Sequence, residues 1–338
     1  MSKPYTLYWS SLSLYEECPQ SFLWQKGWST IDLGRGYGRG IKPPIRKSEH
    51  SSILGICIQK AVEHLYNDEY WRDPGSVIPK MIEKAEKEFQ YELSKKYIDW
   101  RESPSREELW ANISEGVHNY LLTFKQHKLI GSYAKAELEY LTYLDAKTPV
   151  GGRADVVFRR PDSGLTIIDG KNSREYWEGS AKSPSLGVDP DQLRWYALLA
   201  LKATGERPSR LGFVYYRYPY GYRWEREILG ADSEAALASN DNLRAKKLYR
   251  GEFYRNRDPS IGVDWVSYSD DDLNRLAERA IQARSAMESE KFDATPSASA
   301  CKWCPFESIC EARKNQKKSR STRSKTTIST DSIPLEDI

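Results

Sequence analysis

Two short runs rich in β-forming residues, at positions 152–158 and 165–171, are joined by a turn that contains a proline and a glycine. Runs of this length with such a short connection predict a β-hairpin. The second run is apolar until Asp169, and Lys171 follows two positions later. Because side chains alternate along a strand, Asp169 and Lys171 project from the same face. Charged groups are costly in an apolar strand, so the hairpin is a candidate site for chemistry.

A second carboxylate, that of Asp155, lies on the first run of the hairpin. Asp155, Asp169 and the backbone carbonyl of Gly170 could form an all-oxygen site of the type that suits Mg²⁺ or Mn²⁺. Lys171 would then hold a nucleophilic water or stabilise the charge that develops on a phosphate. The alternative is a surface hairpin with a cross-strand salt bridge, since surface ion pairs are common.

The rest of the chain predicts an α+β fold. Segments with helical periodicity alternate with segments of strand periodicity. We expect helices at 11–28, 53–66 and 189–204, a helical insertion at about 76–130, strands at 133–144, 211–218 and 222–229, a core at about 133–230, and closing helices in 231–313.

The charge is unevenly distributed. The 51 Lys and Arg and 48 Asp and Glu residues give a net charge of +3, and this excess lies entirely in residues 314–338. We therefore expect 314–338 to be a disordered basic tail that ends in an acidic and apolar docking peptide. No apolar run approaches the roughly 20 residues of a membrane-spanning helix, and the N-terminus has no apolar export signal. We expect no membrane partner.

Five cysteines are too few for a secreted disulfide scaffold and indicate a reducing compartment, the cytoplasm of a prokaryotic cell or an infected host. Cys301, Cys304 and Cys310 have the spacing C-x₂-C-x₅-C, and Cys18 lies far upstream. Metal ligation explains this clustering better than disulfides do, because four soft thiolates suit an iron–sulfur cluster or zinc. Cys57 is outside the pattern and is expected to be a buried, inert thiol.

The Gly-x-x-Asp run that ends at Asp155, the Asp-x-Lys run at 169–171, and a following helix with Gln192 and Tyr196 resemble the RecB-like branch of the PD-(D/E)XK nuclease superfamily. The resemblance implies a restriction-endonuclease-like core, a central mixed β-sheet flanked by helices. It also implies that Asp155 and Asp169 are metal ligands, that Lys171 is the catalytic lysine, and that Gln192 and Tyr196 flank the active site. Gln192 and Tyr196 share a helix face, although ordinary helix packing also explains that pair.

One motif departs from the RecB-like pattern. That branch usually has an upstream helix with Gly-x-x-x-His, whose histidine helps to bind metal, but here Gly55 is followed by Gln59. Gln59 could offer an amide oxygen to the metal instead. Glu137 or Glu139 could add a carboxylate, because related enzymes often have an acid before the Gly-x-x-Asp strand, and Glu137 is the favoured one.

The cysteine pattern is similar to the iron–sulfur staple of RecB-like nucleases, including recombination nucleases and CRISPR adaptation nucleases. The resemblance implies that Cys18, Cys301, Cys304 and Cys310 hold a [4Fe–4S] cluster that joins the N- and C-terminal regions of a nuclease domain at 1–313. A structural Zn²⁺ site is the alternative.

Residues 215–224 interleave aromatic rings with arginines, as grooves for single-stranded DNA do. Tyr216, Arg217 and Arg223 are therefore candidate DNA contacts, and Arg35 and Arg39 in the glycine-rich segment 34–40 are two more. The alternatives are a strand pair with half-buried aromatic rings and a plain flexible loop.

The expected function is a metal-dependent deoxyribonuclease, an exonuclease on single-stranded or end-containing DNA, in recombination, repair, replication or CRISPR-type processing. Residues 164–172 have the wrong spacing for a phosphate-binding loop of an ATPase motor. Unwinding of duplex DNA would therefore need a separate helicase or recombination protein. The alternative is a DNA-binding or assembly protein with a weak or inactive nuclease site, whose cysteines hold a structural metal.

Overall fold

The computed structural model describes residues 5–26, 41, 49–73, 75–100, 104–172, 189–216, 263–297, 300–301 and 304–316. The chain divides into two compact units, and each is described by itself. The first comprises Met1–Tyr5, Ser10–Arg46 and Ala283–Ile338, and the second comprises Thr6–Trp9 and Lys47–Gln282.

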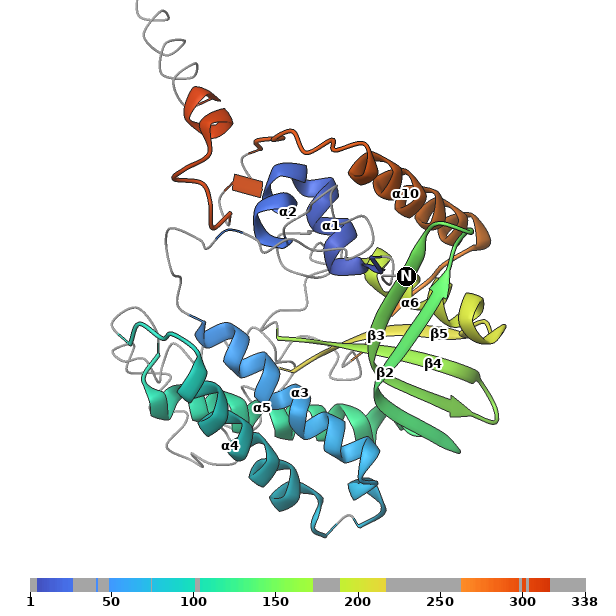
Figure 1. Ribbon diagram of the computed structural model, residues 1–338. Coiled ribbons are helices and arrows are strands. Elements are labelled where there is room, and N and C mark those ends of the chain that lie inside the picture. Colours follow the sequence, from blue (N-terminus) through green and yellow to red (C-terminus); the bar gives the residue numbers. More distant parts are fainter. Residues whose placement is uncertain are drawn as a thin grey trace, which may run out of the picture. The chain divides into compact units, whose positions relative to one another are not determined.

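In its described residues, the second unit is built on one mixed sheet of six strands (Figure 1). Neighbouring strands follow the order β1-β3-β4-β5-β6, and β2 pairs with β3 outside this order. Parallel pairs join β1 to β3 and β4 to β5, and the remaining pairs are antiparallel. The strands are β1 (Leu7–Tyr8), β2 (Tyr133–Tyr143), β3 (Pro149–Arg160), β4 (Gly164–Lys171), β5 (Arg210–Tyr215) and β6 (Val263–Val266).

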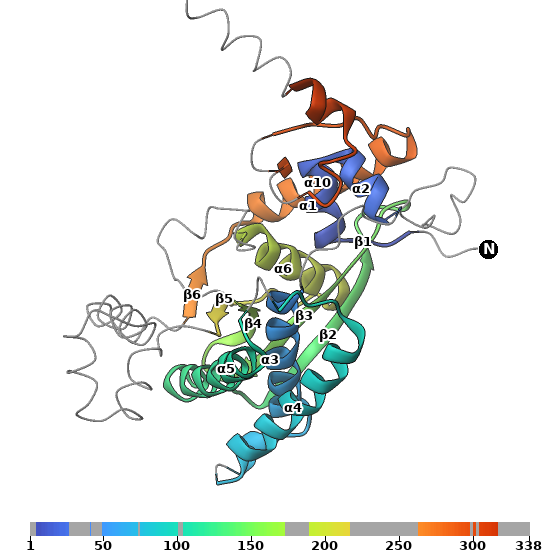
Figure 2. The same cartoon turned by 90° about the vertical axis from the view of Figure 1, so that its left-hand side faces the viewer.

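Helices cover both faces of this sheet, with α6 on one face and α3 and α5 on the other (Figure 2). The helices of the second unit are α3 (His50–Asn67), α4 (Val77–Lys95), α5 (Arg106–His127), α6 (Pro190–Thr204) and most of α10 (Asp270–Glu288), with a short 3₁₀ turn at Tyr70–Arg72. The α+β class and the mixed sheet flanked by helices are confirmed.

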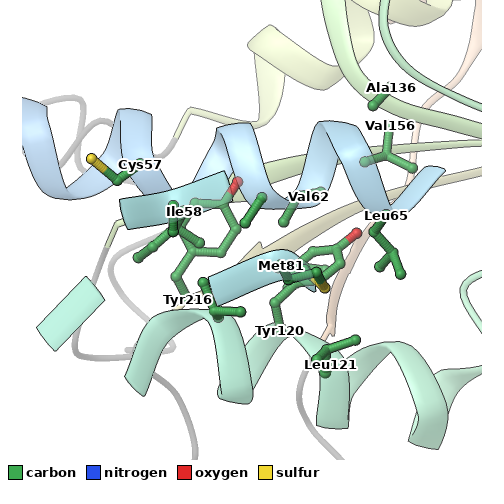
Figure 3. Packing of buried hydrophobic residues seen from close by; sticks show 14 of the residues in the cluster. Cys57, Ile58, Val62, Leu65, Met81, Tyr120, Leu121, Ala136, Val156 and Tyr216 are labelled. Carbon is green, nitrogen blue, oxygen red and sulfur yellow. The ribbon is translucent and has the colours of Figure 1, made fainter. Parts of the chain in front are cut away.

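The hydrophobic core on the α3 face joins the helices to the sheet (Figure 3). Ile58 and Leu65 of α3, Leu121 of α5 and Val156 of β3 are fully or almost fully buried in this one cluster. Burying each such side chain contributes roughly 1.5–3 kcal/mol. This core holds α3 and α5 firmly against the strands that carry the hairpin.

Most element boundaries agree with the expected ones, and the differences have local causes. Residues 11–28 do not form one helix, because Pro19 begins a second helix and splits the segment into α1 (Trp9–Glu17) and α2 (Pro19–Lys26). The short strands β1 and β6 were not predicted. The strand expected at 222–229 and most of the tail at 314–338 lie outside the described residues.

In the first unit, the N-terminal helices pack against the segment that follows α10. The hydroxyl of Tyr15 donates a hydrogen bond to the carbonyl of Lys291 at 2.7 Å. The rings of Phe22 and Phe292 are stacked, with centroids 6.3 Å apart. Segments from opposite ends of the sequence are therefore neighbours in this unit. In the described part of the chain, no helix is both long and apolar enough to cross a membrane.

Candidate active site

Asp169 and Lys171 meet at the end of β4. The carboxylate of Asp169 is 2% exposed, and its Oδ2 lies 2.7 Å from Nζ of Lys171. This is an ion-pair distance, although no donor reaches that oxygen in hydrogen-bonding geometry. An ordinary surface salt bridge does not describe this pair, because Asp169 is buried and only 14% of the Lys171 side chain is exposed.

Gln192 joins both charged groups from the neighbouring helix. Its Nε2 donates to Oδ1 of Asp169 at 2.8 Å, and its Oε1 accepts from Nζ of Lys171 at 2.7 Å. The same Nε2 lies 3.2 Å from the hydroxyl of Tyr196, one turn further along α6. The helix starts here because the side chain of Asp189 accepts the backbone N–H of Asp191 and caps it. The Gln192 and Tyr196 side chains therefore do lie beside the hairpin carboxylates.

Asp155 lies on β3, beside the backbone of Gly170. Its Oδ2 accepts the N–H of Gly170 at 2.8 Å. Burial raises the pKa of Asp155 well above its usual range, and the nearby negative charge of Asp169 raises it further. Two carboxylates that repel each other in a buried place are suited to a shared divalent cation. The donor set therefore fits Mg²⁺ or Mn²⁺.

Glu137 occupies an unusual place in β2. The residues on either side of it, Ala136 and Leu138, pair with Val156 and Ala154 of β3. Glu137 therefore stands opposite Asp155, but these two residues are not themselves paired. Its φ of 57° is in the left-handed region, which is uncommon for a residue other than glycine. Strain of this kind often marks functional sites.

The Glu137 carboxylate has two partners. Oε2 lies 2.5 Å from Nε of Arg153, and Oε1 accepts Nε2 of Gln59 at 2.9 Å. The partnership of Arg153 was missed by the sequence reasoning. Arg153 lies two residues before Asp155 and directly opposite Glu139 in β2. An arginine that pairs with an acidic segment of the neighbouring strand is the signal that could have identified this contact.

Tyr216 follows β5 and is not the exposed DNA contact that was expected. Only 2% of it is exposed, so its ring cannot stack on bases. Its hydroxyl donates to Oε1 of Gln59, and it also lies against Gly170, where an added Cβ would come within 1.8 Å of the hydroxyl oxygen. The other candidate DNA contacts, Arg35, Arg39, Arg217 and Arg223, lie outside the described residues.

The four clustered cysteines line one cavity of about 100 Å³ in the first unit. Gln20 and Ser21 approach two of the sulfurs, with Oε1 of Gln20 3.8 Å from Sγ of Cys310 and Oγ of Ser21 3.7 Å from Sγ of Cys304. Within the residues that the structure describes, no three or more His, Cys, Asp or Glu side chains are arranged to hold a metal ion. The cavity thus collects the predicted thiols, Cys18, Cys301, Cys304 and Cys310, without arranging them as a closed ligand cage.

Comparisons with known proteins bear on most of the chain. The family model described as "PD-(D/E)XK nuclease superfamily" matches residues 8–311. No curated protein matches the sequence. Among solved structures, the chain is similar to one titled "Crystal structure of SSO0001", with 15% sequence identity, a TM-score of 0.30, and coverage of 80% of this chain and 89% of that chain.

Proposed function

Because the chain belongs to the PD-(D/E)XK nuclease superfamily, we propose that it is a metal-dependent deoxyribonuclease of the RecB-like branch. The observation that carries this proposal is the joining of Asp169, Lys171 and Gln192 by three contacts of 2.7 to 2.8 Å. A metal-dependent nuclease needs carboxylates that hold a divalent metal ion. It also needs a positively charged group that stabilises the charge on the phosphate. The hairpin and α6 bring both kinds of group together.

In this proposal, Asp155, Asp169 and the Gly170 carbonyl hold Mg²⁺ or Mn²⁺. The cation, when bound, supplies Lewis-acid activation of a water molecule and of the phosphodiester. Lys171 orients the attacking water or stabilises the charge on the phosphate. The oxygen of that water would bond to phosphorus in line with the 3′-oxygen and lose a proton to solvent. The bond between phosphorus and the 3′-oxygen would break, and the 3′-oxygen would take up a proton from solvent. The products are a 5′-phosphate and a 3′-hydroxyl.

The proposed substrates are single-stranded DNA and free DNA ends, which the enzyme degrades as an exonuclease. Duplex DNA must be opened before a single strand can enter a site, so a helicase or a recombination protein is the proposed partner. Recombination, repair, replication and CRISPR-type processing are the processes that generate such substrates.

The cleavage of labelled single-stranded DNA in the presence of Mn²⁺ tests the nuclease proposal. Wild-type protein should cleave the DNA, and Lys171→Ala should reduce the rate by about 10²–10³, the usual cost of removing a group that stabilises transition-state charge. Lys202→Ala is a matched control, because Lys202 is exposed on α6. If wild type and Lys171→Ala are equally inactive with every metal and substrate, the enzyme proposal fails.

A second candidate function is a DNA-binding or assembly protein with a weak or inactive site. The observation that favours it is that both polar atoms of Gln59, which stands where RecB-like nucleases usually have histidine, are engaged by Glu137 and Tyr216. Retained DNA binding without cleavage in the same assay would support this function.

We further propose that Cys18, Cys301, Cys304 and Cys310 hold a [4Fe–4S] cluster. Their common cavity supports this proposal, because thiolates are the usual ligands of such clusters. The alternative is a Zn²⁺ ion held by the same four thiolates. Anaerobically purified protein should be brown and contain about four irons per chain; colourless protein with one zinc would overturn the cluster.

A further inference from the structure

Gln59 of α3 lies between two groups that fix both ends of its amide. Its Nε2 donates to Glu137 at 2.9 Å, and its Oε1 accepts the hydroxyl of Tyr216. We propose that Gln59 is a positioning residue that acts through Glu137. It fixes a carboxylate that stands opposite Asp155 in the β2–β3 register, where the negative charge of Glu137 adds to the attraction of the cation without binding it directly. Tyr216 sets the orientation of the Gln59 amide. This inference rests on the proposed metal-dependent nuclease, and it replaces the expectation that Gln59 offers its amide oxygen to the metal.

The donor and acceptor roles in this chain of contacts follow from chemistry. The Glu137 carboxylate, as the ion-pair partner of Arg153, can only accept hydrogen bonds. The amide of Gln59 must therefore present its NH₂ group to Glu137. The amide oxygen then faces Tyr216, whose hydroxyl must donate. A flipped amide would place an oxygen against the carboxylate and an NH₂ group against the tyrosine, and the first of these contacts is repulsive.

Tyr216 can set this orientation because it is held in place itself. Its backbone N–H donates to the carbonyl of Lys171 at 2.9 Å, and its carbonyl accepts Nδ2 of the buried Asn119 at 2.9 Å. Its ring packs edge-on against Tyr120, with centroids 6.0 Å apart, in the core that Figure 3 shows. The hydroxyl fits over the Asp-x-Lys segment only because the middle residue, Gly170, has no Cβ.

The same helix holds the strand next to Glu137. Asn67, two turns after Gln59 on α3, donates from Nδ2 to the carbonyl of Ala136 at 3.3 Å and accepts the N–H of Ala136 at 3.1 Å. The backbone immediately before Glu137 is thereby fixed, and Glu137 takes up its left-handed conformation at the next residue. Asn67 thus fixes the backbone of this segment, and Gln59 fixes the carboxylate.

A double-mutant cycle on Mn²⁺ affinity tests the inference. Mn²⁺ binding is measured without DNA by electron paramagnetic resonance, for wild type, Gln59→Ala, Tyr216→Phe and Glu137→Gln, and for the two double variants with Glu137→Gln. Groups that surround the ligands of a metal typically contribute 10- to 100-fold to metal affinity. Gln59→Ala should weaken binding about tenfold and Tyr216→Phe several-fold, and neither should weaken it further once Glu137 is changed.

A direct ligand would give the opposite result. If Gln59 bound the metal itself, the effects of Gln59→Ala and Glu137→Gln would multiply, and Tyr216→Phe would free the amide oxygen and tighten binding. Either outcome overturns the inference. Tyr120→Phe is the matched control, because it also removes a tyrosine hydroxyl from this aromatic cluster. The Tyr120 hydroxyl bonds the hydroxyl of Tyr66 and not Gln59. Weakening of Mn²⁺ binding by Tyr120→Phe to the same extent as by Tyr216→Phe would also overturn it.

The failure of the proposed function would look different. Urea unfolding in EDTA needs no metal and should show a coupling energy between Gln59→Ala and Glu137→Ala if their hydrogen bond exists. Alanine is used at position 137 here because glutamine would keep an oxygen that accepts the Gln59 amide. Additive effects in EDTA would overturn the inference and leave the nuclease standing. Coupling in EDTA combined with no Mn²⁺ binding by wild-type protein would overturn the metal-dependent function, and the positioning role with it.

Discussion

Nζ of Lys171 lies 2.7 Å from Oε1 of Gln192, so the end of a strand and the start of a helix meet in a polar contact between residues 21 positions apart. Gln192 is well suited to this place because an amide both donates and accepts. It donates to Asp169 and accepts from Lys171, whereas a carboxylate in its place would repel Asp169. The ammonium group is further faced by the ring of Phe213, 5.3 Å from its centroid. The lysine is thus held in one orientation before any substrate arrives.

Replacing Gln192 should therefore reduce activity without abolishing the fold. Gln192→Met keeps the length of the side chain and removes the contacts with Asp169 and Lys171. We expect cleavage of single-stranded DNA with Mn²⁺ to slow about 10- to 100-fold, the usual effect of removing a group that orients site residues. Initial rates at saturating DNA measure the change.

Lys202→Met is the matched control, since it replaces an exposed residue of the same helix with the same side chain. Its rate should equal that of wild type. An unchanged rate in Gln192→Met would mean that the helix does not orient the charged pair.

Gly170 should not tolerate alanine, although it lies in a strand, where alanine is usually the better residue. An added Cβ would lie 1.8 Å from the hydroxyl oxygen and 2.3 Å from Cζ of Tyr216. The buried tyrosine must move, at a cost of about 1–3 kcal/mol or more. Urea unfolding should show this loss in Gly170→Ala.

A second glycine gives the opposite expectation. A Cβ at Gly55 would meet only Cβ of Asn172 at 3.7 Å, an ordinary contact, and Gly55 lies within α3. Gly55→Ala should therefore stabilise the protein by about 0.5–1 kcal/mol. Equal effects of the two substitutions would contradict the close approach of Tyr216 to Gly170.

The sequence was a good guide to this site where a local pattern decides the geometry. Alternation along β4 correctly puts Asp169 and Lys171 on one face, and the four-residue spacing in α6 correctly puts Gln192 beside Tyr196. The hairpin follows from its short turn in the same way. These arrangements depend on residues within one element or two adjacent ones.

The contacts of Tyr216 and Gln59 could not be predicted in this way. The two residues are 157 positions apart and meet only because α3 packs against the sheet to which β5 belongs, in a core that also contains Tyr216. The aromatic and basic pattern after position 215 suggested an exposed ring, whereas tertiary packing buries it. The left-handed backbone of Glu137 likewise arises in a segment whose residue pattern is that of a regular strand.

Glu137 should prefer glycine to alanine. Both substitutions remove the carboxylate, so they differ mainly in backbone freedom. At a φ of 57° a Cβ is unfavourable by about 1–2 kcal/mol. Glu137→Gly should therefore unfold at higher urea concentration than Glu137→Ala. At Glu139, which has no such conformation, the order should reverse by about 0.5–1 kcal/mol. The same order at both positions would contradict the left-handed conformation.

Cys57 should make the protein less stable in alkaline solution. It is fully buried, and burial raises the pKa of its thiol from 9.0 to about 12, with the charges of Glu88 and Glu92 adding to the effect. Well below pH 9 the thiol is protonated in both the folded and the unfolded chain, so it causes no pH dependence there. Between pH 9 and 12 the unfolded chain loses this proton and the folded chain does not. The free energy of unfolding then falls as pH rises, by at most about 1.4 kcal/mol per pH unit from this group.

Cys57→Ala separates this contribution from those of the buried tyrosines. The variant should be less stable at pH 7, because it leaves a small cavity in the α3 core. Its stability should nevertheless decline less steeply than that of wild type between pH 9 and pH 10.5, in urea titrations at a series of pH values. The native thiol should also resist iodoacetamide at pH 8, because the thiolate is the nucleophile. Parallel pH curves for wild type and variant, or rapid alkylation of native Cys57, would show that the thiol titrates as it does in the unfolded chain.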